Sequence, residues 1–286
     1  MRTKSNKNTD IVVVGLGLMG ASLALALQRC FRGKDIVALS RTSKKIRAAL
    51  KKRIITWGST DPKIAFANAS MIVIATPVRT IKNFITLAEK HAPQGTIVTD
   101  VGSTKNEIVD WVAKKTFKNI VFVGSHPLAG SDKSGMNNAV KDLYKGEVCF
   151  VTPGTSISSK CTKAVVAFWE KIGSRVVVMN ASMHDRLLAA SSHYPHLLAF
   201  ALVNATKRHC KQAINFVGTG FKDTTRIAAS EPNIWYDIIA SNKKNILRKN
   251  KEMIEELRRV NDLIRRGDAK KIKNYLSRAK EIRETI

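Results

Sequence analysis

Short apolar runs rich in β-branched residues recur along the first 180 positions, separated by stretches with helical periodicity. The runs are Ile11–Val14, Ile36–Leu39, Met71–Ala75, Thr96–Val101, Ile120–Val123, Val148–Thr152 and Val176–Met179. The helical stretches between them are Ala21–Arg29, Lys44–Lys52, Ile81–His91, Lys105–Lys115 and Cys161–Lys171. Apolar runs bounded by turn residues are typical of buried strands. Their alternation with helices predicts an α/β fold, a Rossmann-type doubly wound parallel sheet.

The pattern changes after about Met179, where long helical segments replace the strand-like runs. These segments are His184–His209, Trp235–Arg266 and Lys270–Arg283. We therefore predict two domains, a dinucleotide-binding domain over 1–180 and an all-helical substrate-binding and dimerisation domain over 181–286. Four apolar residues recur at helical spacing in the middle segment: Met253, Leu257, Val260 and Ile264. We expect this stripe to be partly buried against a second subunit, with an intramolecular core as the alternative.

The composition is that of a globular protein with an unusual charge. The 286 residues are 44% hydrophobic and 25% charged, which excludes disordered and fibrous classes. The 49 Lys and Arg against 22 Asp and Glu give a net charge of +27, which favours anionic partners. We find no nucleic-acid-binding motif and no aromatic stacking platform, so we expect no nucleic-acid function. The lysines are read as solvated helix faces whose field steers a phosphorylated cofactor and a carboxylate substrate.

The cysteines and the hydropathy profile indicate in which cellular compartment the protein is expected. The four cysteines lie far apart with no C-x-x-C spacing, so neither a zinc site nor a disulfide framework is predicted. The first ten residues are polar, and no apolar run is long enough to span a membrane. We expect a cytoplasmic protein without a membrane segment.

A glycine-rich turn, Gly15-Leu16-Gly17-Leu18-Met19-Gly20, lies between the first predicted strand and the first predicted helix. A G-x-G-x-x-G match gains its meaning from this strand-to-helix context. Gly15 permits the tight turn, Gly17 lets the backbone approach a pyrophosphate, and Gly20 lets helix and strand pack closely. The turn therefore predicts a dinucleotide site, with Leu18 and Met19 beside the phosphates.

The end of the second predicted strand indicates which dinucleotide binds. An NAD site normally has an Asp or Glu there for the ribose 2′-hydroxyl, whereas this chain has Ser40-Arg41-Thr42-Ser43. A guanidinium with several hydroxyls suits a 2′-phosphate. We predict NADP, and NAD stays possible if Arg41 stacks on the adenine instead.

Two further strand ends point at the same cleft, because ligands bind beyond the carboxyl ends of the strands in such sheets. Thr76-Pro77 follows the third predicted strand, and Asp100-Val101-Gly102-Ser103-Thr104-Lys105 follows the fourth. Helix capping by Ser103 or Thr104 is the alternative.

His126 follows the fifth predicted strand, where the nicotinamide is expected. A neutral histidine there is suited to accept a proton from a substrate hydroxyl.

Several ordered blocks resemble the prephenate and arogenate dehydrogenases of tyrosine biosynthesis. Besides the glycine turn they are the block 100–105, His126-Pro127-Leu128-Ala129-Gly130, Ser192-His193-Tyr194-Pro195-His196, Gly218–Arg226 and Glu231-Pro232-Asn233-Ile234-Trp235. The resemblance implies oxidative decarboxylation of a cyclohexadienol that bears a ring carboxylate, with hydride transfer to NAD(P). It also implies a homodimer.

The resemblance also implies roles for individual residues. His126 is expected to bond the ring hydroxyl, with Ser103 near both that histidine and the nicotinamide. His196 is expected at the substrate ring and Arg226 at the side-chain carboxylate, with Lys105 and His193 as further substrate contacts. His193 and His196 share a helix face and resemble a metal pair. With no third ligand nearby in the sequence, we predict substrate binding and no metal.

Prephenate and arogenate differ only in a side-chain keto or amino group. Asp132 is placed to pair with the ammonium of arogenate, or else to cap the following helix. We favour arogenate or dual use.

Two other functions fit parts of the pattern. One is a 3-hydroxyacid dehydrogenase or imine reductase of the same architecture. The other is a basic dinucleotide- or nucleic-acid-binding protein without catalysis, against which the set Ser103, His126, His196 and Arg226 argues.

Overall fold

The computed structural model describes residues 10–130, 133–155 and 157–286. By internal contacts the chain divides into two units, residues 1–242 and residues 243–286. The domain boundary expected near residue 180 stays a prediction.

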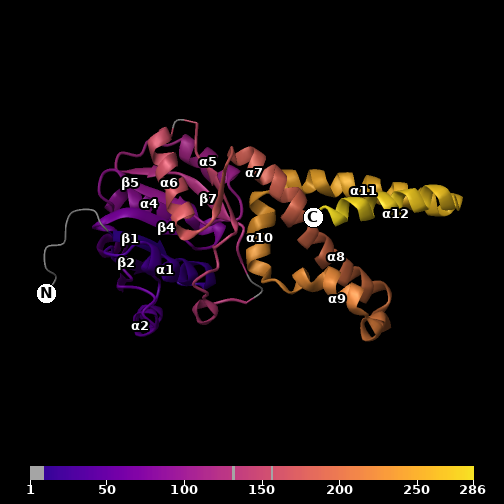
Figure 1. The fold of residues 1–286 in the computed structure, drawn as a ribbon, viewed down its shortest axis with the longest axis horizontal. Coiled ribbons are helices and arrows are strands. Elements are labelled where there is room, and N and C mark those ends of the chain that lie inside the picture. Colours follow the sequence, from indigo (N-terminus) through magenta and orange to yellow (C-terminus); the bar gives the residue numbers. More distant parts are fainter. Residues whose placement is uncertain (1–9, 131–132, 156) are drawn as a thin grey trace. The chain divides into compact units, whose positions relative to one another are not determined.

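A parallel sheet forms the centre of the first unit (Figure 1). In the described part of the chain its strand order is β3-β2-β1-β4-β5-β6. The strands are β1 (Asp10–Val14), β2 (Ile36–Leu39), β3 (Trp57–Ser59), β4 (Ala69–Ile74), β5 (Thr96–Asp100) and β6 (Ile120–Phe122). This is the strand order of a Rossmann sheet, and it reverses direction between β1 and β4. The predicted fold class is confirmed.

Apolar side chains alternate along the strands and build a core on each face of the sheet. Ile11 and Val13 of β1 belong to one cluster, and Val12 and Val14 to the other. Because side chains of a strand alternate between faces, a strand buried on both sides is apolar at most of its positions. Helices of the first 180 residues connect the strands: α1 (Leu18–Cys30), α2 (Ser43–Lys51), α3 (Pro62–Phe66), α4 (Ile81–His91), α5 (Asn106–Ala113) and α6 (Ser159–Ile172).

A second, smaller sheet departs from the expectation that every strand joins one parallel sheet. It has the order β7-β8-β9 and consists of β7 (Gly124–Pro127), β8 (Val148–Thr152) and β9 (Arg175–Val178). The β7–β8 pair is antiparallel. The predicted strand Ile120–Val123 ends as β6 at Phe122, and the chain then turns into β7. His126 therefore lies within a strand rather than after one.

Helices follow β9, as predicted. The first unit continues with α7 (Ala181–Leu188), a π-helical segment at Ala189–His193, α8 (Tyr194–His209), α9 (Thr219–Thr225) and α10 (Pro232–Ser241). The segment expected as one helix over Trp235–Arg266 is divided at Asn242. The second unit is formed by α11 (Lys243–Arg266) and α12 (Ala269–Glu284), which contact each other.

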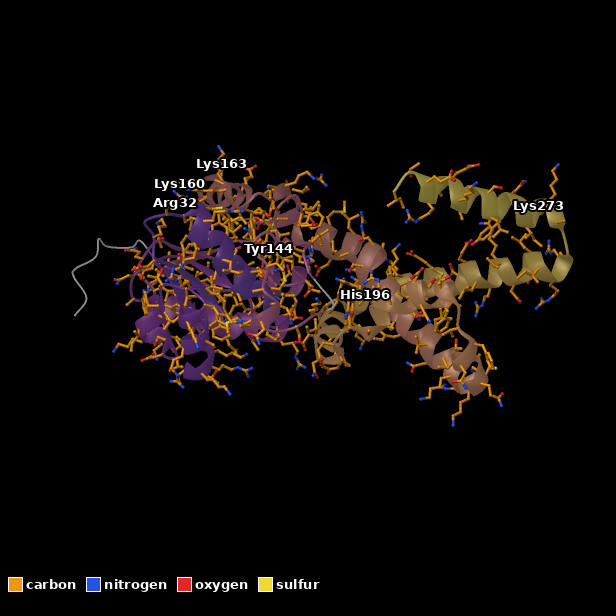
Figure 2. The ribbon with its side chains drawn as sticks, turned by 60° about the horizontal axis from the view of Figure 1, so that its bottom comes forward. Arg32, Tyr144, Lys160, Lys163, His196 and Lys273 are labelled. Carbon is orange, nitrogen blue, oxygen red and sulfur yellow. The ribbon has the colours of Figure 1, made fainter. Side chains whose placement is uncertain are left out.

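The basic side chains lie largely on exposed helix faces. Figure 2 shows Arg32, Lys160 and Lys163 extending from the surface near the end of α1 and on α6, whereas Tyr144 lies in the interior. The Tyr144 hydroxyl donates a hydrogen bond of 2.7 Å to the carbonyl of Met19, which ties the core to the start of α1. Among the residues that the structure describes, no helix is both long and apolar enough to cross a membrane.

Candidate active site

The glycine turn between β1 and α1 has the backbone geometry that the motif predicts. Gly15 has a φ of +96°, in the left-handed region that favours glycine. A Cβ on Gly20 would lie 1.9 Å from the carbonyl oxygen of Gly15, so no larger residue fits there. A Cβ on Gly17 would meet nothing within 4 Å. The backbone at Gly17 therefore faces open space at the N-terminus of α1, as a pyrophosphate requires.

A cavity of about 370 Å³ opens at the carboxyl ends of β1, β4 and β5. Six residues predicted from the sequence line it: Gly17, Leu18, Met19, Thr76, Pro77 and Ser103. Lys133 and Asp237 also line it, and the sequence patterns did not indicate them. The cavity lies where the strand order reverses, so the residues present fit a dinucleotide.

The segment Ser40–Ser43 lies beside the glycine turn. The amide of Gly15 donates to the carbonyl of Leu39, the last residue of β2, at 2.9 Å. Ser40 is buried, whereas Arg41 is exposed and has no ion pair within the described ranges. The guanidinium is thus available at the strand end where a dinucleotide presents its adenosine ribose.

Lys105, which was predicted as a substrate contact, lies in the interior of the first unit. Its side chain is fully buried, and its ammonium forms an ion pair with the equally buried Asp100. It also donates to the carbonyl of Ser125 at 3.0 Å. The Asp100 carboxylate accepts from the amides of Gly102 and Ser125. Lys105 therefore ties the ends of β5 and β7 together, and its predicted contact with the substrate stays a prediction.

His126 lies in β7 beside these two residues and is 8% exposed. Burial lowers its pKa well below the ordinary value, and His184, Lys105 and His193 lower the pKa further. The imidazole is therefore neutral at neutral pH and able to accept a proton.

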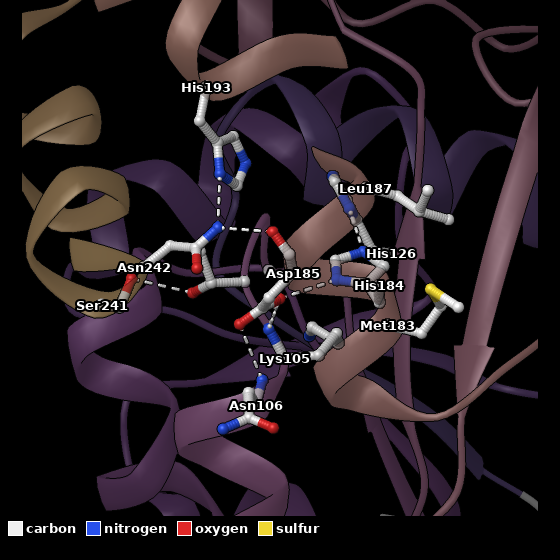
Figure 3. A network of polar contacts seen from close by, with 12 residues as sticks. Lys105, Asn106, His126, Met183, His184, Asp185, Leu187, His193, Ser241 and Asn242 are labelled. Atoms are coloured by element: carbon white, nitrogen blue, oxygen red, sulfur yellow. Dashed lines mark hydrogen bonds and ion pairs between the residues drawn. The ribbon is translucent and has the colours of Figure 1, made fainter. Parts of the chain in front are cut away.

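A hydrogen-bonded network joins His126 to His193 (Figure 3). His126 Nδ1 lies 2.9 Å from His184 Nε2, and His184 Nδ1 lies 2.8 Å from a carboxylate oxygen of Asp185. The Asn242 amide nitrogen donates to the Asp185 carbonyl at 2.8 Å and contacts His193 Nδ1 at 3.0 Å. The sequence analysis missed His184, Asp185 and Asn242. The signal for His184 was its place on the helical segment that also carries His193 and His196.

His193 is buried, and its two ring nitrogens differ in their hydrogen bonding. Nδ1 accepts from Asn242, so the proton lies on Nε2, which makes no hydrogen bond to the part of the chain that the structure describes. Burial lowers the pKa of His193 to about 4, and the backbone of Ser103 opposes this shift. His193 is therefore neutral at neutral pH, with its one ring proton on Nε2.

His196 stacks on Trp235 of α10, with ring centroids 3.8 Å apart and an angle of 22°. Its Nδ1 donates to the Ser192 carbonyl at 2.9 Å, which leaves Nε2 as an acceptor. Burial lowers its pKa, and the charge of Arg226 also lowers it. Arg226 is exposed and begins a 3₁₀ turn at Arg226–Ala229. His193 and His196 thus both contact the Trp235 ring, and Arg226 is close enough to His196 for its charge to act on that ring.

Two further predictions concern Asp132 and metal binding. Asp132 lies outside the described residues, so its predicted contact with an ammonium stays a prediction. Within the described ranges, no group of three His, Cys, Asp or Glu side chains is arranged to hold a metal ion.

Comparisons with known protein families cover nearly the whole chain. Residues 23–178 match the family model for the nucleotide-binding domain of prephenate dehydrogenase, and residues 180–278 match the model for its dimerization domain. The chain belongs to the prephenate dehydrogenase family. This membership favours that family over the hydroxyacid and imine reductases of similar architecture.

Individual relatives agree with this assignment. The prephenate dehydrogenase of Bacillus subtilis is 33% identical over 96% of this chain and 76% of its own length. The structure of prephenate dehydrogenase from A. aeolicus, in complex with hydroxyphenyl propionate and NAD+, has a TM-score of 0.89 at 30% identity and covers 99% of both chains. The structure of Synechocystis arogenate dehydrogenase has a TM-score of 0.83 at 25% identity, covering 96% of this chain and 99% of its own.

Two alanine substitutions in the glycine turn are expected to separate folding from cofactor binding. Gly20→Ala forces a Cβ onto the Gly15 carbonyl, so it should destabilise the protein by about 1–3 kcal/mol. Gly17→Ala meets no protein atom and should leave stability within about 1 kcal/mol of the original while weakening dinucleotide binding at least about tenfold. Urea denaturation measures the first effect, and quenching of reduced-nicotinamide fluorescence measures the second. Tight binding by Gly17→Ala would contradict the assigned phosphate position.

Proposed function

We propose that this chain oxidises prephenate, arogenate or both, with hydride transfer to a nicotinamide dinucleotide and loss of the ring carboxylate as carbon dioxide. Its membership in the prephenate dehydrogenase family supports this activity. The observation that carries the assignment to residues is the buried, neutral imidazole of His126 on β7, next to Ser125, whose backbone bonds both Asp100 and Lys105.

The proposed reaction uses His126 as the proton acceptor. Its Nε2 takes the proton of the ring hydroxyl, which raises electron density at the carbon that bears the leaving hydride. When bound, the nicotinamide ring accepts that hydride. The bond from the ring to its carboxylate then breaks, and its electron pair completes an aromatic phenol whose oxygen regains a proton from His126. Aromatisation provides the driving force, so the step needs no metal ion.

The remaining residues would hold the substrate in place. Arg226 is suited to clasp the side-chain carboxylate with two parallel hydrogen bonds. The lone pair of His196 Nε2 can accept from a substrate hydroxyl, and the Nε2–H of His193 can donate to a substrate oxygen. Ser103, which lines the cavity, would lie between the nicotinamide and the substrate.

The His126→Asn substitution tests the role of the base. Asparagine can still form hydrogen bonds but cannot take up a proton, so kcat should fall about 10²- to 10⁴-fold with the Michaelis constant little changed. Turnover of prephenate and of arogenate, each with NAD and NADP, is followed by nicotinamide absorbance. The exposed His209→Asn serves as control and should retain full activity.

The same measurement carries a pH dependence. Because the pKa of His126 lies well below 6.5, its neutral form persists as the pH falls. The acid limb of kcat/KM for the original protein should therefore lie below about pH 6.5. Unchanged turnover of both substrates by His126→Asn would overturn the proposed mechanism, and the relative kcat/KM values decide our preference for arogenate or dual use.

For the cofactor we propose NADP as the preferred dinucleotide. Arg41 is exposed at the end of β2, and no carboxylate follows that strand where an NAD site would have one. A 2′-phosphate would gain charge-assisted hydrogen bonds from the guanidinium and from the hydroxyls of Thr42 and Ser43.

Removing the guanidinium tests this preference. Arg41→Ala should raise the Michaelis constant for NADP about tenfold or more, because a hydrogen bond to a charged group is worth about 1.5–3 kcal/mol. The constant for NAD should change less than about threefold, since NAD has no 2′-phosphate. Lys160→Ala, an exposed cation on α6, is the control for the general loss of positive charge. Equal effects on both cofactors would contradict the assignment.

We further propose that the chain forms a homodimer through its helical part. The match of residues 180–278 to a dimerization domain supports this. Within the α11–α12 unit, large apolar side chains are exposed, including Leu257 at 57% and Ile264 at 64%. These belong to the predicted stripe, and helices with such faces normally bury them against another element.

Charged substitutions on this stripe are expected to separate the subunits. The original protein should show twice its chain mass of 31.6 kDa in light scattering after size exclusion. Leu257→Glu combined with Ile264→Glu should shift it toward a monomer, because a carboxylate buried in an apolar interface is strongly unfavourable. Lys251→Glu, which adds a carboxylate elsewhere on α11, should leave the mass unchanged. A monomeric original protein would disprove the dimer.

A further inference from the structure

Two buried residues, His184 and Asp185, continue a chain of hydrogen bonds that begins at His126, and we call this chain the relay. Neither of the two lines the cavity. His184 and Asp185 are neighbours on α7, and their exposed fractions are 0% and 1%. Figure 3 shows the order of contacts, from the His126 ring to the His184 ring and from there to the Asp185 carboxylate. The distances, 2.9 Å and 2.8 Å, are those of hydrogen bonds.

The chemistry of the three groups fixes where the protons lie. A carboxylate only accepts hydrogen bonds, so the contact with Asp185 places a proton on His184 Nδ1. Burial lowers the pKa of His184, although Asp185 opposes this, so the ring is neutral and holds only that proton. His184 Nε2 must then accept, and the proton of the second contact belongs to His126 Nδ1.

The Asp185 carboxylate is itself held in place. One oxygen also accepts from the amide of Lys105 at 2.8 Å, and the other accepts from the amide of Asn106 at 3.0 Å. These amides are at the start of α5, where backbone N–H groups have no partner inside the helix. Phe150 of β8 packs edge-on against the His184 ring, with centroids 5.3 Å apart. Neither ring nor carboxylate can rotate without breaking several contacts.

We propose that His184 and Asp185 are positioning residues that hold His126 in the tautomer with the proton on Nδ1. The lone pair of His126 is thereby kept on Nε2, the nitrogen that remains for a substrate hydroxyl. The inference rests on the proposed function for its catalytic meaning. The tautomer itself can be measured without any substrate. An imidazole free of such partners exchanges between both tautomers, and the Nε2–H form could not accept the hydroxyl proton.

The first experiment reads the tautomer directly. The full-length protein with ¹⁵N-labelled histidine contains only six histidines, and two-bond nitrogen–proton correlations distinguish a protonated ring nitrogen from a bare one. In the original protein, His126 should show a protonated Nδ1 and a bare Nε2. His126→Asn identifies its signals. A protonated Nε2 on His126 would overturn the proposal, whatever the variants do.

The second experiment uses two substitutions at His184. His184→Phe keeps a ring of similar size but removes the acceptor, so the Nε2–H tautomer of His126 should appear. We expect kcat to fall about 10²-fold while KM changes little. His184→Gln offers its amide oxygen near the former Nε2, so it should restore the tautomer and recover at least about tenfold of the lost kcat. Exposed His209→Phe is the control and should change neither.

The outcomes separate the relay from the proposed function. Wild-type kcat in His184→Phe, with the tautomer unchanged, would refute the relay even if His126 proved essential. The expected tautomer together with an active His126→Asn would leave the relay standing and refute the catalytic role of His126. If His184→Phe does not fold, the wild-type spectrum and His184→Gln still decide the question.

Discussion

The buried ion pair between Asp100 and Lys105 is the interaction on which the candidate active site depends. Asp100 ends β5, and its carboxylate accepts the amides of Gly102 and Ser125 as well as the ammonium. Lys105 returns a hydrogen bond to the Ser125 carbonyl. The pair therefore ties the end of β5 to β7, and with it the turn that carries Ser103 to the strand that carries His126. Burying two charges is favourable only when such additional bonds satisfy them, and losing one partner of a buried pair typically costs about 3–5 kcal/mol.

The same polar cluster explains why the chain leaves the parallel sheet after β6. The Ser125 hydroxyl contacts the Asp100 carbonyl, the Thr99 hydroxyl and the indole N–H of Trp169. These partners come from β5 and α6, so Ser125 is fixed from both sides. His126, the next residue, then faces α7 rather than the sheet. Because β7 leaves the parallel sheet in this way, His126 is buried more deeply than a residue of a surface loop would be.

The sequence predicted those parts of the fold that depend on local patterns. A buried parallel strand is rich in β-branched apolar residues, so the runs that became β1, β4 and β5 were recognisable, and the glycine turn follows from its spacing. The three residues of β3 are too few for a periodic signal. The break at Asn242 was missed because the sequence on either side of it is helical, in α10 and in α11. Its contacts are with Asp185 and His193, which are distant in the sequence. The ion pair of Lys105 with Asp100 was not predicted, because whether two side chains close in sequence both point inward depends on the folded chain.

The relay could not be predicted for a related reason. His126 and His184 are 58 residues apart, and only the packing of α7 against α5 and β8 brings them together. Asp185 serves both functions at once, because the carboxylate that caps α5 also orients His184. His126, His184 and His193 are kept neutral in the folded protein by burial. This lowers the free energy of unfolding at any pH at which the same histidines are protonated in the unfolded chain. Above about pH 6.5 these histidines therefore do not reduce the free energy of unfolding. Below that pH the free energy of unfolding declines as the pH falls toward the lowered pKa values of the folded state. The neutral state is needed for the proposed reaction, because a protonated His126 would still donate from Nδ1 to His184 but would have no lone pair on Nε2 to accept the substrate proton.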